Sequence, residues 1–408
     1  MRILKCRLCE SVNIQKIVDL GNHPLADTFL PPEILFASPE ISYPLQLGQC
    51  QDCGHVFTLF AVSPEDRYQK TDYSYDSSNS KVSIQHFYDF AKAVLDEKVP
   101  DQKGLIVDIG SNTGTLLKHF QSFGFENVIG IEPSANISAL AIKAGVHTIN
   151  DFFSERVIKH LHEAGSVQVL LSANVLNHAD NIVDLLDTVK AVLAKDGIFV
   201  FEVPYLLDLV QSTAFDTIYH EHVHYHSIQP LALALERQGI SIFKVERIDY
   251  MCGSIRVYTR FGRTHSPAVR LMIEAEQAFG LFDSTTWSSF MARVRKVKTT
   301  VLAQLAEIRV NGGKIIGIGA ATKGNTFLNY CRLDSDTITY VTDASPLKIG
   351  KLMPGSHIPI IDDTDIDSFS THALILPWNI APMLKTKLAH LGLIFYVPQV
   401  ETLLPSDY

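Results

Sequence analysis

The feature that constrains the fold most is an alternation of short apolar runs with helical segments, which occurs twice. Between about residues 85 and 258, the runs LIVDIG, NVIGI, VQVLLSA and GIFVFEVP are separated by segments with helical periodicity. After helices expected over about 267–310, the alternation resumes in KIIGIGA, TITYVTD, ALILPW and LIFYVP. Such alternation is typical of a parallel sheet with helices on both faces. The sequence therefore predicts two α/β units.

Composition divides the chain into four expected segments. Residues 1–65 are rich in proline and turn residues and contain the dense cysteine cluster, so we expect a small metal-stapled module. Residues 66–84 are polar and rich in tyrosine without helical periodicity, which indicates either a linker or a lid over a site. The two α/β units then occupy residues 85–262 and 263–408.

Two CxxC pairs, separated by 40 residues, predict a metal site in the first segment. Each pair holds two sulfurs on one side of a tight turn, and four thiolates are the set that tetrahedral zinc prefers. Because no position is left for a substrate, we expect a structural zinc ion, with unrelated buried cysteines as the alternative. The expected ligands are Cys6, Cys9, Cys50 and Cys53.

Charge and hydropathy limit the partners. The net charge of -9 counts against a large nucleic-acid surface, because phosphate binding needs clustered Lys and Arg. The chain has no run of about 18 apolar residues, and its start, MRILKCRLCE, does not resemble a signal peptide. We expect a cytoplasmic protein without nucleic-acid or membrane partners. We also expect a monomer, since three domains in one chain can build a whole site.

A glycine-rich loop, Gly110-Ser111-Asn112-Thr113-Gly114, follows the strand LIVDIG and opens a helix. Glycines let the backbone approach a ligand, and the helix N-terminus offers free amides. Glu132 ends the next strand, 22 positions after Gly110, where it can accept hydrogen bonds from ribose hydroxyls. Asp108, just before the loop, can hold a cationic amino-acid tail. The pattern predicts a nucleoside site, with a ligand-free glycine turn as the alternative.

Four histidines fall within the eight residues Tyr219–His226, which follow the strand FVFEVP by about fifteen residues. Imidazole titrates near neutral pH, and a neighbouring carboxylate can orient it. This set suits the removal of a proton from a carbon beside a carbonyl. His178 follows the strand VQVLLSA and is expected at the same rim. A solvated polar loop and a second metal site are the alternatives.

The segment GIGAATKGNT, residues 317–326, again follows a strand and opens a helix. Its backbone amides can bind phosphate, and Lys323 adds positive charge. One alternative is a unit that only packs. Another is a second cofactor such as NAD, with Asp343 as the ribose-binding acid.

Taken in order, the double CxxC, GSNTG, NHADN, YHEHVHY, GSIRVY and GIGAATKGNTFLNY resemble the sugar C-methyltransferases that make branched deoxysugars. The resemblance covers essentially the whole chain, and VDIGSNTGTLL with GIEPS resembles the first two motifs of class I methyltransferases. It implies an N-terminal zinc-binding module, a central class I methyltransferase Rossmann-like domain and a C-terminal Rossmann-like α/β domain. S-adenosylmethionine would bind to Asp108, Gly110, Ser111, Asn112, Gly114, Glu132, Pro133, Asp151, Phe152 and Asn174.

The resemblance also implies a substrate, a 4-keto-6-deoxyhexose linked to dTDP or GDP. The methyl group would go to the carbon beside the ketone, with position 3 favoured over 5. His222 would be the general base, with Glu221 and Tyr219 as its partners. His178 and Tyr73 would lie around the sugar and its enolate, so that residues 66–84 form a lid. The C-terminal domain would help to bind the nucleotide, and the expected substrate contacts are Lys323, Asn325 and Arg256.

One segment departs from the family: Met251-Cys252-Gly253 stands where histidine-glycine-glycine commonly precedes GSIR. Three other functions stay open. A methyltransferase acting on oxygen or nitrogen of a small metabolite leaves YHEHVHY unexplained. A nucleic-acid methyltransferase conflicts with the acidic balance. A non-catalytic zinc-ribbon scaffold makes no use of the two glycine-rich loops.

Overall fold

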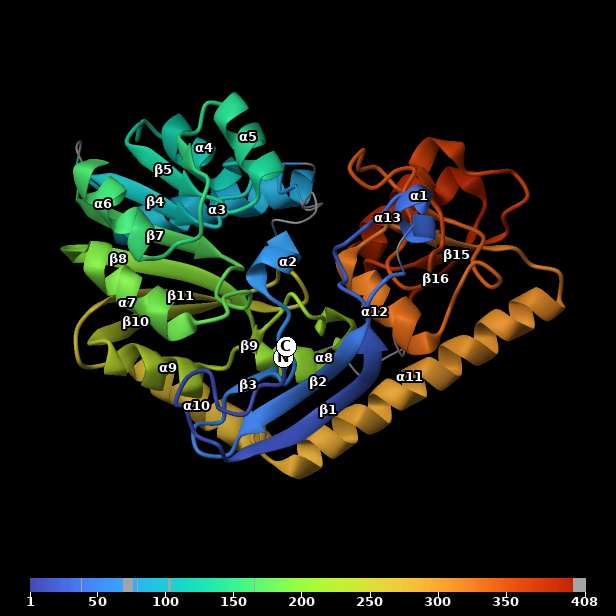
Figure 1. Ribbon diagram of the computed structural model, residues 1–408, viewed down its shortest axis with the longest axis horizontal. Helices are drawn as coiled ribbons and strands as arrows, with labels where there is room; N and C mark the ends of the chain where they lie inside the picture. Colours follow the sequence, from blue (N-terminus) through green and yellow to red (C-terminus); the bar gives the residue numbers. More distant parts are fainter. Residues whose placement is uncertain (38, 69–75, 79, 102–103, 165, 399–408) are drawn as a thin grey trace.

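The computed structural model describes residues 1–37, 39–68, 76–78, 80–101, 104–164 and 166–398. Tyr73, the expected lid residue, lies outside these ranges. Figure 1 shows two larger α/β parts, with the first strands of the chain packed beneath and between them. Within the described ranges, no helix combines the length and apolar character needed to cross a bilayer.

The N-terminal module is built on a four-stranded antiparallel sheet. Strands β1 (Ile14–His23), β2 (Tyr43–Cys50) and β3 (Val56–Thr58) follow one another, and β9 (His224–Tyr225) completes the sheet. Because β9 belongs to the histidine-rich segment, the module contributes directly to the placement of that segment. Two short helices complete it, α1 (Pro32–Ala37) and α2 (Pro64–Tyr68).

The central domain contains a seven-stranded sheet in the order β10-β11-β8-β7-β4-β5-β6. Six strands run in the same direction, and β11 runs antiparallel to both of its neighbours. The strands are β4 (Leu105–Ile109), β5 (Val128–Ile131), β6 (Thr148–Ile149), β7 (Val167–Ala173), β8 (Leu193–Pro204), β10 (Ile240–Ile248) and β11 (Ser254–Phe261). The helices are α3 (Lys81–Glu97), α4 (Thr115–Ser122), α5 (Ala135–Lys143), α6 (Glu155–Ala164), α7 (Ile182–Val192), α8 (Leu206–Ser212) and α9 (Ile228–Arg237).

The C-terminal domain has a five-stranded, fully parallel sheet in the order β14-β13-β12-β15-β16. In both α/β sheets the strand order reverses at the first strand: β4 lies between β5 and β7, and β12 lies between β13 and β15. A crevice for ligands forms outside the carboxyl ends of the strands at such a point. The elements are β12 (Ile315–Ile318), α12 (Thr322–Cys331), β13 (Val341–Asp343), β14 (Ile360–Asp362), β15 (His372–Ile375), α13 (Ala381–Leu388) and β16 (Ile394–Tyr396).

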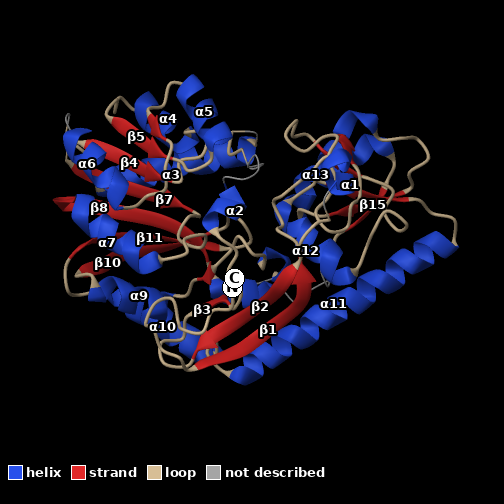
Figure 2. Ribbon diagram, in the orientation of Figure 1, coloured by secondary structure: helices blue, strands red, loops and turns tan. Residues whose placement is uncertain are grey.

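Two helices connect the α/β parts, and both follow the boundary expected at residue 263. Helix α10 (Pro267–Phe279) packs on α9 and β10, and its buried Glu276 accepts the hydroxyl of Tyr205 at 2.9 Å. This helix therefore belongs to the central domain. Helix α11 (Ser284–Val310) then runs beneath β1 to the C-terminal domain, as Figure 2 shows along one edge of the molecule.

Candidate active site

A cavity of about 1890 Å³ lies where the three parts of the chain meet. It is bordered by the loops after β4 and β5, by the histidine-rich segment, and by the loops after β12 and β13. A pocket for one small ligand commonly measures about 300–1,000 Å³. The cavity therefore has room for two ligands side by side, one at each glycine-rich loop.

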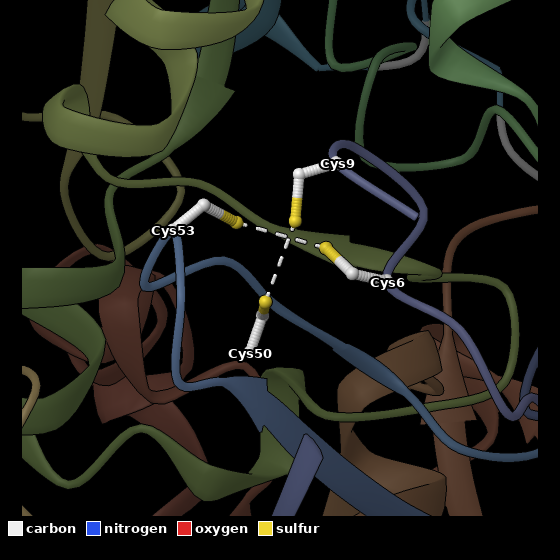
Figure 3. Close-up of side chains that lie close together, drawn as sticks. All are labelled: Cys6, Cys9, Cys50 and Cys53. Carbon is white, nitrogen blue, oxygen red and sulfur yellow. Dashed lines mark hydrogen bonds between the residues drawn. The ribbon is translucent and has the colours of Figure 1, made fainter. Parts of the chain in front are cut away.

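The four cysteines of the CxxC pairs converge outside this cavity (Figure 3). The Sγ atoms of Cys6 and Cys53 are 3.7 Å apart, and those of Cys9 and Cys50 are 3.5 Å apart. A tetrahedral zinc ion with Zn–S bonds of about 2.3 Å places its sulfurs about 3.8 Å from one another. The cluster therefore fits zinc, and its four thiolates leave no open position for catalysis.

The pocket at the first glycine-rich loop contains a buried carboxyl group. Asp108 is 3% exposed, and its Oδ1 has no hydrogen-bond partner among the described residues. Burial, reinforced by the nearby charge of Glu132, raises the pKa of Asp108 to about 8. A cationic amine would pair with this carboxylate and satisfy the orphaned oxygen. At Gly110, where φ is 64°, an added Cβ would overlap Val175, so only glycine keeps the crevice open.

Two other polar groups complete this pocket. The Glu132 carboxylate accepts the backbone N–H of Asn112 at 3.1 Å and that of Ser134 at 2.8 Å. Burial raises the pKa of Glu132, and these hydrogen bonds oppose the rise. Asn174 has the left-handed φ of 58°, and within the described chain its buried Oδ1 has no partner. The donor and acceptor set fits the amine, ribose and amino-acid tail of S-adenosylmethionine.

Most of the expected cofactor-binding residues border the cavity, but two do not. Gly114 caps α4, where an added Cβ would lie 2.7 Å from Cγ2 of Val146. The carboxylate of Asp151 pairs at 3.1 Å with Arg156, which does reach the cavity. The residues at the cavity are Asp108, Gly110, Ser111, Asn112, Glu132, Pro133, Phe152 and Asn174.

His222 is held as a neutral imidazole with one basic nitrogen. Its Nδ1 lies 2.8 Å from the carbonyl oxygen of Thr217, which can only accept, so Nδ1 carries the proton. Its Nε2 then accepts the hydroxyl of Tyr219 at 2.6 Å. Burial lowers the pKa of His222 to about 4, so the ring stays neutral near pH 7. The pair provides a base and a phenol at one edge of the cavity.

His178 lies beside this pair, with its ring centroid 4.8 Å from that of His222 in an edge-on arrangement. Its Nδ1 is 2.7 Å from the hydroxyl of Tyr68, the last residue of α2. Burial holds the pKa of His178 well below its ordinary value. Tyr68 was not among the predicted residues. The tyrosine-rich composition after residue 66 was the signal that could have identified it.

Glu221 does not have the expected contact with His222. In the described part of the chain no hydrogen bond joins the two side chains, and a backbone carbonyl orients the imidazole instead. The Oε1 of Glu221 accepts the backbone N–H of Asp27 at 2.9 Å. Burial first, and then the charge of Asp27, raises the pKa of Glu221 to about 7. Glu221 is therefore a separate acid of the cavity, not the carboxylate partner of His222.

An ion pair between a buried arginine and a half-buried aspartate fixes the loops that present these groups. The guanidinium of Arg67 pairs with Asp180 and donates to the carbonyl oxygen of His178 at 3.1 Å. Arg7, inside the first CxxC turn, donates to the carbonyl oxygen of Asp180 at 2.6 Å. Charge-assisted hydrogen bonds of this kind are stronger than neutral ones. The cysteine-rich module is thereby fastened to the NHADN loop, a connection that sequence reasoning missed.

The second glycine-rich loop borders the opposite end of the cavity. Lys323 lies over the ring of Trp378, 4.5 Å from its centroid, and pairs with Asn379. The carboxylate of Asp343 accepts the backbone N–H of Ala320 at 2.8 Å. Asp343 therefore holds the loop in place, and Lys323 is one of the cationic side chains that border the cavity here.

Two expected substrate contacts lie elsewhere. Asn325 is buried and donates to the carbonyl oxygen of Ala26 at 2.6 Å, which joins the C-terminal domain to the N-terminal module. Arg256 is buried in the central sheet, where it pairs with Glu202 at 2.6 Å and covers the ring of Phe90. Neither residue is among those at the cavity. The structure therefore does not bring either side chain to the cavity, and both contact other parts of the protein instead.

Comparison with known proteins assigns the chain to a family. A model described as "C-methyltransferase C-terminal domain" matches residues 249–398, one described as "Methyltransferase domain" matches 84–245, and one described as "Putative zinc binding domain" matches 6–68. The C-methyltransferase NovU of Streptomyces niveus is 31% identical over 383 residues, which are 93% of this chain and 90% of that protein. The chain belongs to the C-methyltransferase family. It is an enzyme, and its methyl donor is S-adenosylmethionine, as predicted.

Solved structures with similar folds are also methyltransferases. One from Mesorhizobium loti is 18% identical with a TM-score of 0.33, and covers 42% of this chain and 97% of its own. Another, from Clostridium acetobutylicum, is 13% identical with a TM-score of 0.36, and covers 45% of this chain and 94% of its own. These values are too low to add to what the fold shows.

The C-methyltransferase has an unusual turn at residues 251–253. Met251, Cys252 and Gly253 have successive φ values of 52°, 76° and 100°, a conformation that costs free energy for residues other than glycine. All three border the cavity, and Cys252 Sγ lies 3.3 Å from Nζ of Lys323. The turn therefore helps to shape the site between the two glycine-rich loops.

Proposed function

We propose that this C-methyltransferase acts on a 4-keto-6-deoxyhexose linked to a nucleoside diphosphate, at the carbon beside the ketone. Position 3 is favoured over position 5. The observation that carries the proposal is the neutral His222 with its Tyr219 partner, set in a cavity between two glycine-rich loops. A carbon acid needs a base of this kind, whereas transfer to an oxygen or nitrogen with a lone pair does not.

In this proposal, S-adenosylmethionine supplies an electrophilic methyl group at the first loop. Asp108 binds its amine and Glu132 its ribose. Nε2 of His222 takes up the proton from the substrate carbon, and the Tyr219 hydroxyl leaves that nitrogen to donate to a sugar oxygen. The enolate formed carries its charge on the former ketone oxygen, which requires nearby donors. His178 lies beside His222, and the hydroxyl of Tyr68, which is hydrogen-bonded to His178, can supply such a donor.

The second loop is proposed to hold the diphosphate. Backbone amides at the start of α12 and the ammonium group of Lys323 face the cavity there, and both suit phosphate oxygens. Residues of all three parts of one chain border the cavity, which supports the predicted monomer. A cluster of four cysteines arranged to bind zinc fits a reducing compartment, which supports the predicted cytoplasmic location.

The test is a direct assay with a panel of dTDP- and GDP-linked 4-keto-6-deoxyhexoses and methyl-labelled S-adenosylmethionine. Mass spectrometry should detect a product heavier by one methylene, and NMR should show the label bonded to a ring carbon. The carbon that carries the label names the position. A label on oxygen, or no product while the cofactor still binds, would refute the keto-sugar assignment.

Two variants separate chemistry from binding. His222→Ala should lower kcat by about a hundredfold or more and leave cofactor affinity nearly intact, since it removes the base. His220→Gln is the matched control, because His220 is also buried but contacts the backbone carbonyl of Tyr43 and does not border the cavity. Equal losses in both variants would contradict the assigned role of His222.

A further inference from the structure

A carboxylate from the N-terminal module lies where the cavity meets the histidine-rich segment. Asp27, on the loop after β1, is 7% exposed and borders the cavity. Its backbone N–H donates to Oε1 of Glu221 at 2.9 Å. The other oxygen of Glu221 is buried without a hydrogen-bond partner in the described chain, which an ionised carboxylate tolerates poorly.

The same residue contacts the C-terminal domain. Oδ1 of Asp27 accepts the hydroxyl of Thr322 at 2.7 Å, and Thr322 is the first residue of α12. Next to it, the carbonyl oxygen of Ala26 accepts the side-chain amide of Asn325 at 2.6 Å. Three hydrogen bonds of residues 26 and 27 therefore connect the start of α12 to Glu221.

The groups around Glu221 come from three elements. Asp27 adds a like charge, while Arg67 of α2 donates to the backbone carbonyl of Glu221 at 3.5 Å. The phenols of Tyr68 and Tyr219 are buried beside these carboxyls, and the charges of Glu221 and Asp27 contribute to the raised pKa of each phenol. Two carboxyl groups that share a buried site do not both ionise readily, so one of them keeps a proton.

We propose that Asp27 is a positioning residue for methyl transfer: it keeps Glu221 as a neutral carboxylic acid and ties that acid to the start of α12. A neutral acid can donate a hydrogen bond to the ketone oxygen as negative charge develops there, and it retains its proton throughout. The bond to Thr322 makes the orientation of Glu221 depend on the loop assigned to the diphosphate. This inference rests on the proposed function.

The charge of Asp27 is tested by Asp27→Asn, which keeps the backbone N–H and an oxygen for Thr322. The readout is the infrared band of a protonated carboxyl, assigned to Glu221 by subtracting the spectrum of Glu221→Gln. In the wild type the band should disappear near pH 7, and in Asp27→Asn about one pH unit lower. The variant's kcat at pH 7 should fall about tenfold, with the KM for the sugar within about twofold of the wild type.

The link to α12 is tested separately by Thr322→Val, which should raise the KM for the nucleotide sugar about fivefold. Asp19→Asn is the matched control, because Asp19 is an exposed carboxylate of β1 in the same module. It should leave the band, kcat and KM unchanged. A band midpoint and kcat that do not move in Asp27→Asn would overturn the proposal.

Two further results keep the test decisive. If the wild type methylates no keto-sugar, the proposed function fails, but the infrared midpoint still decides the role of Asp27. If Asp27→Asn does not fold, Glu221→Gln decides, because an amide is neutral and also donates. Its kcat should then stay within about tenfold of the wild type and no longer decline above pH 7. Loss of activity of about a hundredfold or more at every pH would mean that Glu221 works as an anion, and would overturn the proposal.

Discussion

The buried carboxyl of Asp108 predicts that the affinity for S-adenosylmethionine depends on pH. Its pKa of about 8 means that about one-tenth of the free protein carries the carboxylate at pH 7, and about one-hundredth at pH 6. Pairing with the amine of the cofactor requires the ionised form. The apparent Kd is the intrinsic Kd divided by the competent fraction. The Kd should therefore fall about tenfold, or ~1.4 kcal/mol, between pH 6 and pH 7.

The direction of this change in affinity with pH follows from the linkage between cofactor binding and ionisation of Asp108. Because binding favours the ionised carboxyl, it should release nearly one proton at pH 7, and affinity should rise with pH below the pKa of about 8. The window ends near pH 7, since an α-amino group itself begins to lose its proton at about 7.7–8.0. Titration calorimetry in two buffers of different ionisation enthalpy measures both the Kd and the number of protons released.

Asp108→Asn should abolish the proton release and flatten the pH dependence of the Kd. Asp96→Asn is the control, because Asp96 is an exposed carboxylate on α3 of the same domain that does not border the cavity, and it should leave both quantities unchanged. A wild-type Kd that is equal at pH 6 and pH 7, with no proton released, would refute this account of the pocket.

Three other predictions concern the cysteine cluster, the ion pair of Arg67 and the hydroxyl of Tyr68. Cys50→Ser should lose bound zinc and lower the unfolding temperature, whereas Cys331→Ser, which changes a buried thiol outside the cluster, should keep its zinc. Metal analysis measures the zinc content and thermal unfolding measures the stability. A fully folded zinc-free protein would contradict the structural role of the metal. Arg67→Met should destabilise the protein by about 2 kcal/mol, because it removes the closer of the two guanidinium partners of Asp180 while Arg7 remains 3.4 Å away, and adding Asp180→Asn should recover part of the loss in denaturant unfolding. Additive losses in the double variant would argue against the pair. Tyr68→Phe should reduce kcat by up to about tenfold without changing cofactor affinity, and an unchanged kcat would remove Tyr68 from the site.

The local motifs were readable from the sequence because each is contiguous. The strand LIVDIG with Gly110 and Glu132 predicted a nucleoside pocket, and the structure places the end of that strand, Gly110 and Glu132 at one cavity. The CxxC spacing likewise predicted the four-cysteine cluster. Such features depend on backbone conformation and short-range geometry, which a few consecutive residues determine.

Contacts between distant segments were not readable in this way. Glu221 is next to His222 in sequence, yet it contacts Asp27, and the imidazole is oriented by a backbone carbonyl. Arg256 belongs to a motif of the family, but it is enclosed by partners from other strands. Asn325 follows a phosphate-binding type of loop, but its amide turns toward the N-terminal module. Residue type alone does not tell which way a side chain points.

The sequence by itself determined the elements: two α/β units, a four-thiolate cluster and a glycine-rich loop at the start of each α/β unit. Hydrophobic periodicity and turn chemistry are local, so a single sequence carries them. Only the tertiary structure decided that the N-terminal module contacts both the histidine-rich segment and the start of α12. In that arrangement β3 pairs with β9, and Asp27 is hydrogen-bonded to Glu221 and Thr322. The reason is physical: burial of shared polar groups selects partners far apart in the chain, and no local pattern encodes that choice.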